Sequence, residues 1–64
     1  MKFVVLDNNG HYFVRFHPTQ FRPFDYDYSD RLDVVARNGG ILSYKEAISV
    51  ASLINGKFKV YFDE

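Results

Sequence analysis

The chain has 64 residues, no cysteine and equal numbers of acidic and basic side chains, eight of each. A chain of this length forms a single small domain, residues 1–64, whose stability is marginal unless something compensates for its small core. The lack of cysteine excludes disulfides and thiolate metal sites, and we expect a cytoplasmic protein. Residues 3–6, the longest N-terminal apolar run, are too few for a signal peptide or a spanning helix, so no membrane role is predicted.

The N-terminal residues predict a β-hairpin. Residues 2–6 and 11–16 are rich in β-branched and aromatic side chains, and the turn sequence Asp7-Asn8-Asn9-Gly10 separates them. Asn-Gly is a strong hairpin signal because both residues tolerate positive φ. The first strand is apolar on both faces, which favours a central place in the sheet. Alternation in the second strand predicts two faces: Tyr12, Val14 and Phe16 on one, and His11, Phe13, Arg15 and His17 on the other.

Residues 17–40 predict a short irregular or helical insert. Pro18 and Pro23 each remove a backbone donor, so regular strand pairing should lapse between them. The alternation of residues 24–29 indicates a short edge strand, with the aromatic side chains on one face and Asp25 and Asp27 on the other. Residues 32–36 then show apolar spacing typical of a helical turn that ends at Asn38-Gly39-Gly40. A strand through residues 32–37 is the alternative.

The clearest local signal is Ser43-Tyr44-Lys45-Glu46. It fits the capping box S-x-x-E, in which the serine oxygen accepts from the backbone of the glutamate and the glutamate accepts from the backbone of the serine. We therefore predict a helix that begins at Tyr44 and ends at Asn55-Gly56, where a left-handed residue stops it. Residues 57–62 alternate as a final strand. Its predicted inward residues are Phe58, Val60 and Phe62, and its outward residues are Lys57, Lys59 and Tyr61.

These elements predict an α+β fold. It consists of a three-stranded antiparallel sheet of order 2-1-3, with one helix packed on one face and the insert at residues 17–40. The last strand follows the helix through a tight turn and pairs most simply beside the first strand, which connection rules permit without crossings.

Neither catalysis nor metal binding is predicted. A metal site needs three or four ligands, and the chain offers only two histidines, His11 and His17, with carboxylates elsewhere. The residue types of a catalytic triad occur, but no nucleophile elbow and no Gly-rich phosphate loop accompany them. A single helix on a sheet also leaves little volume for the pre-formed pocket that enzymes usually have. We therefore expect a non-enzymatic protein without a cofactor.

Residues 21–33, here called the acidic aromatic segment, form the candidate site. The segment contains two Phe, two Tyr, four Asp and two Arg. Four acids exceed what helix caps and edge-strand protection require, and Tyr, Phe and Arg are enriched at interface hot spots. In an extended strand Asp25 and Asp27 would stand about 6.6 Å apart, a spacing that resembles neighbouring phosphates of a nucleic acid. The predicted partner-binding residues are Phe21, Arg22, Phe24, Asp25, Tyr26, Asp27, Tyr28, Asp30 and Asp33.

A purely structural interpretation of the segment is the alternative. In it the Asp residues cap a helical turn and protect an edge strand, while the aromatic residues complete a small core. If Phe24, Tyr26 and Tyr28 are buried together, only the acids are left for an interface.

The second half of the chain carries a resemblance. Residues 43–56 have the pattern S-x-x-E-A-x-x-x-A-x-x-I-N-G and lead into a terminal strand. With the N-terminal hairpin, this resembles small uncharacterised proteins carried by phages and prophages of Gram-positive bacteria. The resemblance implies a host bacterial cytosol and an inhibitor of host machinery, a class that includes anti-CRISPR proteins. It covers the hairpin and residues 43–62, and it assigns no functional residues.

Three hypotheses follow. The first is a phage-type inhibitor, most concretely an anti-CRISPR protein, that binds a basic nucleic-acid-handling host protein as a DNA mimic, with charge complementarity speeding the encounter. The second is a nucleic-acid-binding module that uses Arg15, Lys57, Lys59, Tyr61 and exposed aromatics, including Phe13, on a bare sheet face. The acidic segment disfavours this direct nucleic-acid binding. The third is a homodimer that buries the bare face.

Overall fold

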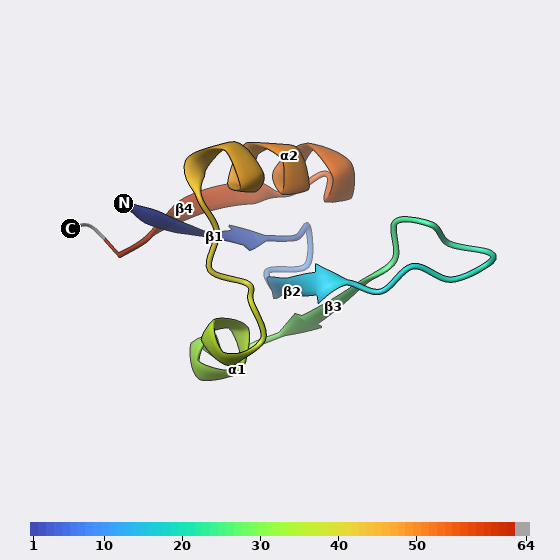
Figure 1. The fold of residues 1–64 in the computed structure, drawn as a ribbon, viewed down its shortest axis with the longest axis horizontal. Helices are drawn as coiled ribbons and strands as arrows, with labels where there is room; N and C mark the ends of the chain where they lie inside the picture. Colours follow the sequence, from blue (N-terminus) through green and yellow to red (C-terminus); the bar gives the residue numbers. More distant parts are fainter. Residues whose placement is uncertain (63–64) are drawn as a thin grey trace.

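Strand β1, Lys2–Leu6, is the element on which the fold is built. The computed structural model describes residues 1–62 and contains β2, Tyr12–Phe16, β3, Tyr26–Ser29, and β4, Lys57–Phe62, in one sheet with β1 (Figure 1). Its strand order is β3-β2-β1-β4, and all pairings are antiparallel. Helices α1, Leu32–Arg37, and α2, Tyr44–Ile54, complete the fold.

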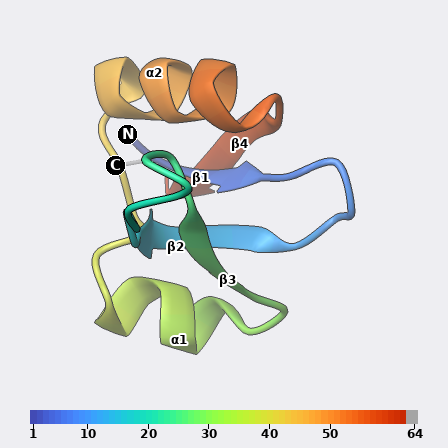
Figure 2. The same ribbon diagram turned by 90° about the vertical axis from the view of Figure 1, so that its right-hand side faces the viewer.

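The two helices lie on opposite sides of the sheet (Figure 2). Successive side chains of a strand point to opposite faces. Phe3 and Val5 of β1 pack in one apolar cluster with α2 residues, whereas Val4 packs in a second cluster with Val35 of α1. Val4, Val5 and Val35 are completely buried. The domain therefore has two small cores, one on each face of the sheet, and β1 contributes to both.

The predicted fold class, α+β, is confirmed, but the predicted numbers of strands and helices were each too low by one. The order 2-1-3 is present as the β2-β1-β4 part of the sheet. The sheet has a fourth strand, β3, at its edge, and a second helix, α1, on the other face, where the prediction had three strands and one helix. Both additions lie within residues 17–40. The alternation of residues 24–29 and the apolar spacing of residues 32–36 indicate both elements, and the helix is confirmed over the alternative strand. Elements of only four and six residues do not show by sequence where they join the fold.

A register shift between Phe13 and Arg15 changes the faces of β2. Across this bulge Phe13 and Phe16 lie on the same side of the sheet, their rings 5.0 Å apart between centroids. The predicted grouping of Phe16 with Tyr12 and Val14 is therefore wrong. A bulge inserts one residue into a strand and so breaks the strict alternation on which that prediction relied.

Local signals at α2 are confirmed. The Ser43 hydroxyl accepts from the Glu46 backbone, and the Glu46 carboxylate accepts from the Ser43 backbone at 3.1 Å. Asn55 ends the helix with φ of 57°.

At the hairpin the positive φ belongs to Gly10 and not to Asn9. There, Asp7 Oδ1 accepts from the backbone N–H groups of Asn9 and His11, both at 2.9 Å.

Gly56 connects the end of α2 to the start of β4 and lies close to the end of β1. A Cβ built on Gly56 would overlap the carbonyl oxygen of Leu6 and come within 3.3 Å of Asp7 Cα. Because both neighbours are backbone atoms, they can give way only if β1 moves.

We expect Gly56→Ala to lower the free energy of unfolding by an amount at the upper end of the roughly 1–3 kcal/mol typical of overpacking, because the overlap is with backbone. Gly10→Ala is the control, since no atom lies within 4 Å of its Cβ and only the positive φ opposes it, at a cost of about 1–2 kcal/mol. Urea denaturation of both variants measures the difference. An equal loss in the two variants would contradict close packing at Gly56.

Candidate functional site

A buried carboxylate, Asp7, connects the hairpin to the edge strand. Its residue is only 8% exposed. Oδ1 accepts the two backbone N–H groups of the turn, and Oδ2 accepts from the Tyr26 hydroxyl of β3 at 3.1 Å. Strand β2 lies between these two elements in the sheet order. The contact therefore ties the β1–β2 turn to β3, which carries part of the acidic aromatic segment.

These hydrogen bonds set the ionisation of both groups. Burial alone would raise the pKa of Asp7, but the backbone donors of His11 and Asn9 and the Tyr26 hydroxyl outweigh it, and the pKa lies below its ordinary value. Burial, followed by the hydrogen bond to Asp7, raises the pKa of Tyr26. At neutral pH Asp7 is thus an anion that accepts hydrogen bonds from a protonated tyrosine.

His11 lies against the other end of β3. Its ring stacks on Tyr28 with centroids 4.6 Å apart and ring planes 13° apart. Nε2 is 3.4 Å from Asp30 Oδ1, and Nδ1 is 3.9 Å from Asp7 Oδ2. Tyr28 is still 59% exposed. Its outer face is therefore open to a partner, while its inner face is fixed by the histidine.

Two of the predicted interface carboxylates are paired with arginines. Asp27 accepts from Arg15 Nε at 2.9 Å, across the β2–β3 ladder. Asp33 accepts from Arg31 and Arg37 at 2.7 and 3.1 Å. Residues 25–33 carry a net charge of −3 in the sequence. Since Arg15 and Arg37 lie against them, the local surface carries about one negative charge.

The other two predicted acids are placed differently. Asp25 precedes β3 and is half-buried, and its carboxylate accepts from the backbone N–H of Tyr26 at 3.0 Å. Asp30 is largely exposed, with 79% of its side chain accessible. Asp25 lies just before β3, which begins at Tyr26, and its carboxylate is used by the backbone, whereas that of Asp27 is paired with Arg15.

The aromatic residues of the segment separate into two groups. Tyr26 is half-buried and packs against the core through Phe13. Phe21, Phe24 and Tyr28 are exposed, by 88%, 59% and 59%. The structure thus brings only one of these four rings into the core and leaves three in solvent.

Phe21 lies in a loop, residues 17–25, that projects from the sheet between β2 and β3 (Figure 1). The His17 N–H donates to the Asp25 carbonyl at 2.7 Å and closes the base of the loop. Within it, the Thr19 N–H donates to the Arg22 carbonyl at 3.0 Å, and the Arg22 N–H donates to the Thr19 hydroxyl at 2.9 Å. With its two prolines, the loop holds Phe21 in a defined position although little of the ring is covered.

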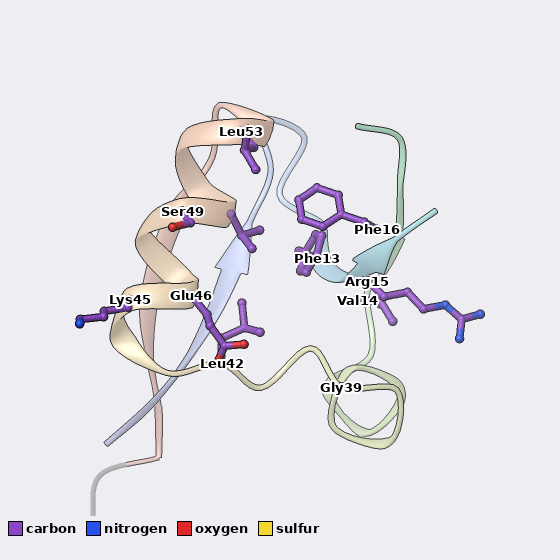
Figure 3. Close-up of a pocket in the computed structure, with 11 residues that line it drawn as sticks. Phe13, Val14, Arg15, Phe16, Gly39, Leu42, Lys45, Glu46, Ser49 and Leu53 are labelled. Atoms are coloured by element: carbon purple, nitrogen blue, oxygen red, sulfur yellow. The ribbon is translucent and has the colours of Figure 1, made fainter. Parts of the chain in front are cut away.

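An apolar groove of about 440 Å³ runs between α2 and β2. Phe13, Phe16 and Leu53 lie along it, whereas the side chains of Arg15 and Lys45 extend away from it (Figure 3). Its other lining residues are Val14, Gly39, Leu42, Glu46, Ser49 and Val50. The groove exists because α2 contacts β1 and β4 and leaves β2 open on this face.

The predicted basic face is divided by the fold. Lys59 lies over the Tyr12 ring, 5.3 Å from its centroid, on the sheet face opposite α2. Phe13 is 3% exposed and belongs to the core on the α2 side, so the prediction that it lies on the open face is wrong. Arg15 is paired with Asp27. Of the residues predicted for the basic face, three remain together on β4: Lys57, Lys59 and Tyr61.

Sequence reasoning missed Asp7 and the groove. An Asp at the start of a hairpin turn usually serves the turn alone, so no signal indicated the bond to Tyr26, nineteen residues away. The groove joins residues from α2, β2 and the connection before α2, and no local pattern reports which half of a sheet face a helix covers.

Comparisons with protein families, curated proteins and solved structures found no match. None of the described helices is long and apolar enough to cross a membrane. Within residues 1–62, no three histidine or carboxylate side chains come together as a metal site.

Asp7→Asn tests the buried carboxylate through pH. The folded pKa lies below the ordinary value of 3.8, so the ionised group stabilises the fold above that pH and loses this contribution as pH falls through the folded pKa. We expect the variant to be less stable at pH 7 by about 1–3 kcal/mol. The difference from wild type should shrink as the pH falls below 4.

The pKa values of Asp33 and Glu46 are lowered as well, chiefly by the Arg31 side chain and by the Ser43 backbone. Both groups are present in wild type and variant, so their effects cancel in the difference. Thermal unfolding of the two proteins from pH 7 to pH 2 measures it. Asp30→Asn, which alters a largely exposed carboxylate, is the control, and a gap between wild type and Asp7→Asn that stays constant with pH would refute the assignment.

Proposed function

We propose that this chain is a non-enzymatic protein-binding domain that contacts its partner through the loop at residues 17–25. The observation that carries the proposal is the 88% exposure of Phe21 on a loop held by its own hydrogen bonds. Aromatic anchors dominate the energetics of protein interfaces. A loop that is already ordered loses little conformational entropy on binding, so more of the contact energy appears as affinity.

Phe24 and Tyr28 are two further exposed rings of the acidic aromatic segment. Both are 59% exposed, and Tyr28 is backed by the stacked His11 ring. Asp30, which is 3.4 Å from the same His11 ring, supplies an accessible carboxylate. The surface is therefore aromatic with a weakly acidic rim, which suits a partner pocket that is apolar inside and bordered by Arg or Lys.

In its most specific form the proposal is an inhibitor that blocks a nucleic-acid-handling host protein, with a CRISPR effector nuclease as the concrete candidate. The sequence resemblance to small phage proteins supports this form. In the mechanism, the aromatic anchors enter the partner's surface and Asp30 pairs with a cation that otherwise binds phosphate. The pairing of Asp27 and Asp33 with arginines gives the aromatic side chains the larger share of the contact.

Affinity capture from a bacterial lysate tests this function. We expect the tagged wild type to retain a partner that the double variant Phe21→Ser, Phe24→Ser fails to retain, because both anchors are lost while no buried residue changes. Ile48→Ser is the matched control, since Ile48 is an apolar residue, 40% exposed, on the distant helix α2. Retention of the same partner by the double variant would contradict the proposal.

Asp30→Lys is the variant that tests the acidic rim. It is preferable to a change at Asp27, which would leave Arg15 without its partner on β2. A reduction of several-fold in affinity is expected for the loss of one rim charge.

A second candidate function is single-stranded nucleic-acid binding by β4. Lys57, Lys59 and Tyr61 lie on one strand, Tyr61 is 42% exposed, and Tyr12 adds a ring beneath Lys59. Cations beside stacked rings are the usual elements of such surfaces. With two lysines, however, the surface offers few phosphate contacts.

Fluorescence anisotropy with single-stranded DNA and RNA separates the two functions. If the chain is a protein-binding domain, we expect no binding that falls steeply with salt. Salt-dependent binding that disappears in Lys57→Glu, Lys59→Glu and survives in Phe21→Ser would favour the nucleic-acid function instead.

A further inference from the structure

Strand β4 forms an open edge of the sheet. It pairs with β1 on one side, and in the described part of the chain no strand lies on its other side. Successive residues of an antiparallel strand direct their N–H and C=O groups alternately towards one neighbour and towards the other. Along residues 57–60, where the pairing with β1 is regular, every second residue therefore presents both backbone groups outward. With six residues, β4 is longer than β3, the four-residue strand at the opposite edge.

Two lysines lie along this edge on the side of the sheet that carries α1. Residues directly opposite in paired strands share a face. Lys59 is opposite Val4, which packs in the cluster with α1, and Lys57 follows the same alternation. Both lysines are exposed, because α1 contacts β2 and β3 and leaves this part of the face open. Within residues 1–62 the ion pairs all lie elsewhere, so neither lysine is neutralised by a carboxylate of the described chain.

An apolar strip lies along the same edge on the α2 side. Phe58 is opposite Val5, and Val60 is opposite Phe3. The Phe58 ring is 5.7 Å from the Phe3 ring and 5.8 Å from the Tyr44 ring, measured between centroids. Phe58, Val60 and Tyr44 are nevertheless 38%, 49% and 55% exposed. The edge thus has cations on one face and uncovered apolar side chains on the other.

This arrangement specifies the side chains of a strand that would add to β4. Alternate residues of the added strand lie beside the two lysines, and the residues between them lie beside the apolar strip. Opposite charges across a strand pair are favourable, and like charges are unfavourable. The complementary sequence therefore alternates acidic with apolar residues.

The same charges disfavour two other occupants. A second copy joined through this edge would add its own two lysines to the face that already carries Lys57 and Lys59, and lysine on an edge strand is a protection against such pairing. A nucleic acid would pair with the lysines. Its phosphodiester backbone, however, offers acceptors and no donors, so the outward C=O groups of β4 would stay without partners. An extended peptide satisfies both kinds of backbone group.

We infer that the edge of β4 binds an extended segment of a partner protein in which acidic residues alternate with apolar ones, and which joins the sheet as an additional strand. In this mode of recognition the main-chain hydrogen bonds supply affinity and the alternate side chains supply specificity. The surface is separate from the loop at residues 17–25, because β4 and β3 are opposite edges of the sheet.

Amide NMR spectra of the isotope-labelled protein test the inference with a short peptide in which glutamate and valine alternate. We expect the β4 signals to shift, and hydrogen exchange of every second β4 amide to slow, because those N–H groups gain a partner. The control peptide has the same composition with all glutamates placed before the valines, so it does not match the two faces. It should bind about tenfold more weakly or worse.

Charge reversal tests the lysines. Lys59→Glu should weaken peptide binding several-fold, and the double variant Lys57→Glu, Lys59→Glu by about tenfold or more, because each attraction becomes a repulsion. A peptide of alternating lysine and valine should prefer the double variant to wild type. Lys45→Glu is the matched control for Lys59→Glu, since it makes the same charge change on the side of α2 that lines the groove beside β2. Phe21→Ser should bind the peptide as wild type does, which keeps this test independent of the proposed function.

Four results would each overturn the inference. The first is the absence of any shift in the β4 signals at peptide concentrations up to about 1 mM. The second is equal binding of the peptide by wild type and the double lysine variant. The third is protection of the β4 amides without peptide that rises with protein concentration, which would assign the edge to a second copy. The fourth is tighter binding of single-stranded DNA than of the peptide at the same signals, which would assign it to a nucleic acid.

Discussion

The burial of both faces of β1 is the constraint on which the structure depends. Val4 and Val5 are neighbours in sequence, point to opposite faces, and are both completely buried. Burying a valine side chain contributes roughly 1.5–3 kcal/mol, a large share of the stability of a domain this small. Each face must therefore be covered, and the chain covers one with α2 and the other with α1. The groove beside α2 follows from the same arrangement, since each helix covers only half a face.

The hydrogen bonds of Asp7 hold β3, and with it the loop at residues 17–25, in position relative to this core. They join the hairpin turn to Tyr26, and Tyr26 packs on Phe13 in the main core. Strand β3 is thereby held at both of its faces, by the core on one side and by pairing to Arg15 on the other. The loop that begins at His17 and returns at Asp25 is fixed at its base by this strand pair. An exposed aromatic side chain can be an efficient anchor only when its support is rigid in this way.

Surface ion pairs act here mainly on charge and little on stability. The pairs among Arg31, Asp33 and Arg37 are exposed, and such pairs add little to stability because solvent and salt screen them. Their effect is to neutralise an acidic stretch that looks strongly charged along the chain. The acidic aromatic segment is consequently more aromatic than acidic as a surface, which moves the emphasis of the proposed interface from DNA-like charge to Phe21, Phe24 and Tyr28.

The sequence by itself determined the hairpin, the capped helix α2, the last strand and the central place of β1, because caps, turns and alternation act between residues a few positions apart. It also indicated the short strand β3 and the helix α1, though not their places in the fold. Tertiary structure alone decided the two-sided core, the bulge in β2, the bond from Asp7 to Tyr26 and the pairing of Asp27 with Arg15. Each of these joins side chains from different elements, and the energy that selects them is burial or charge pairing across the sheet, which leaves no periodic trace in the chain.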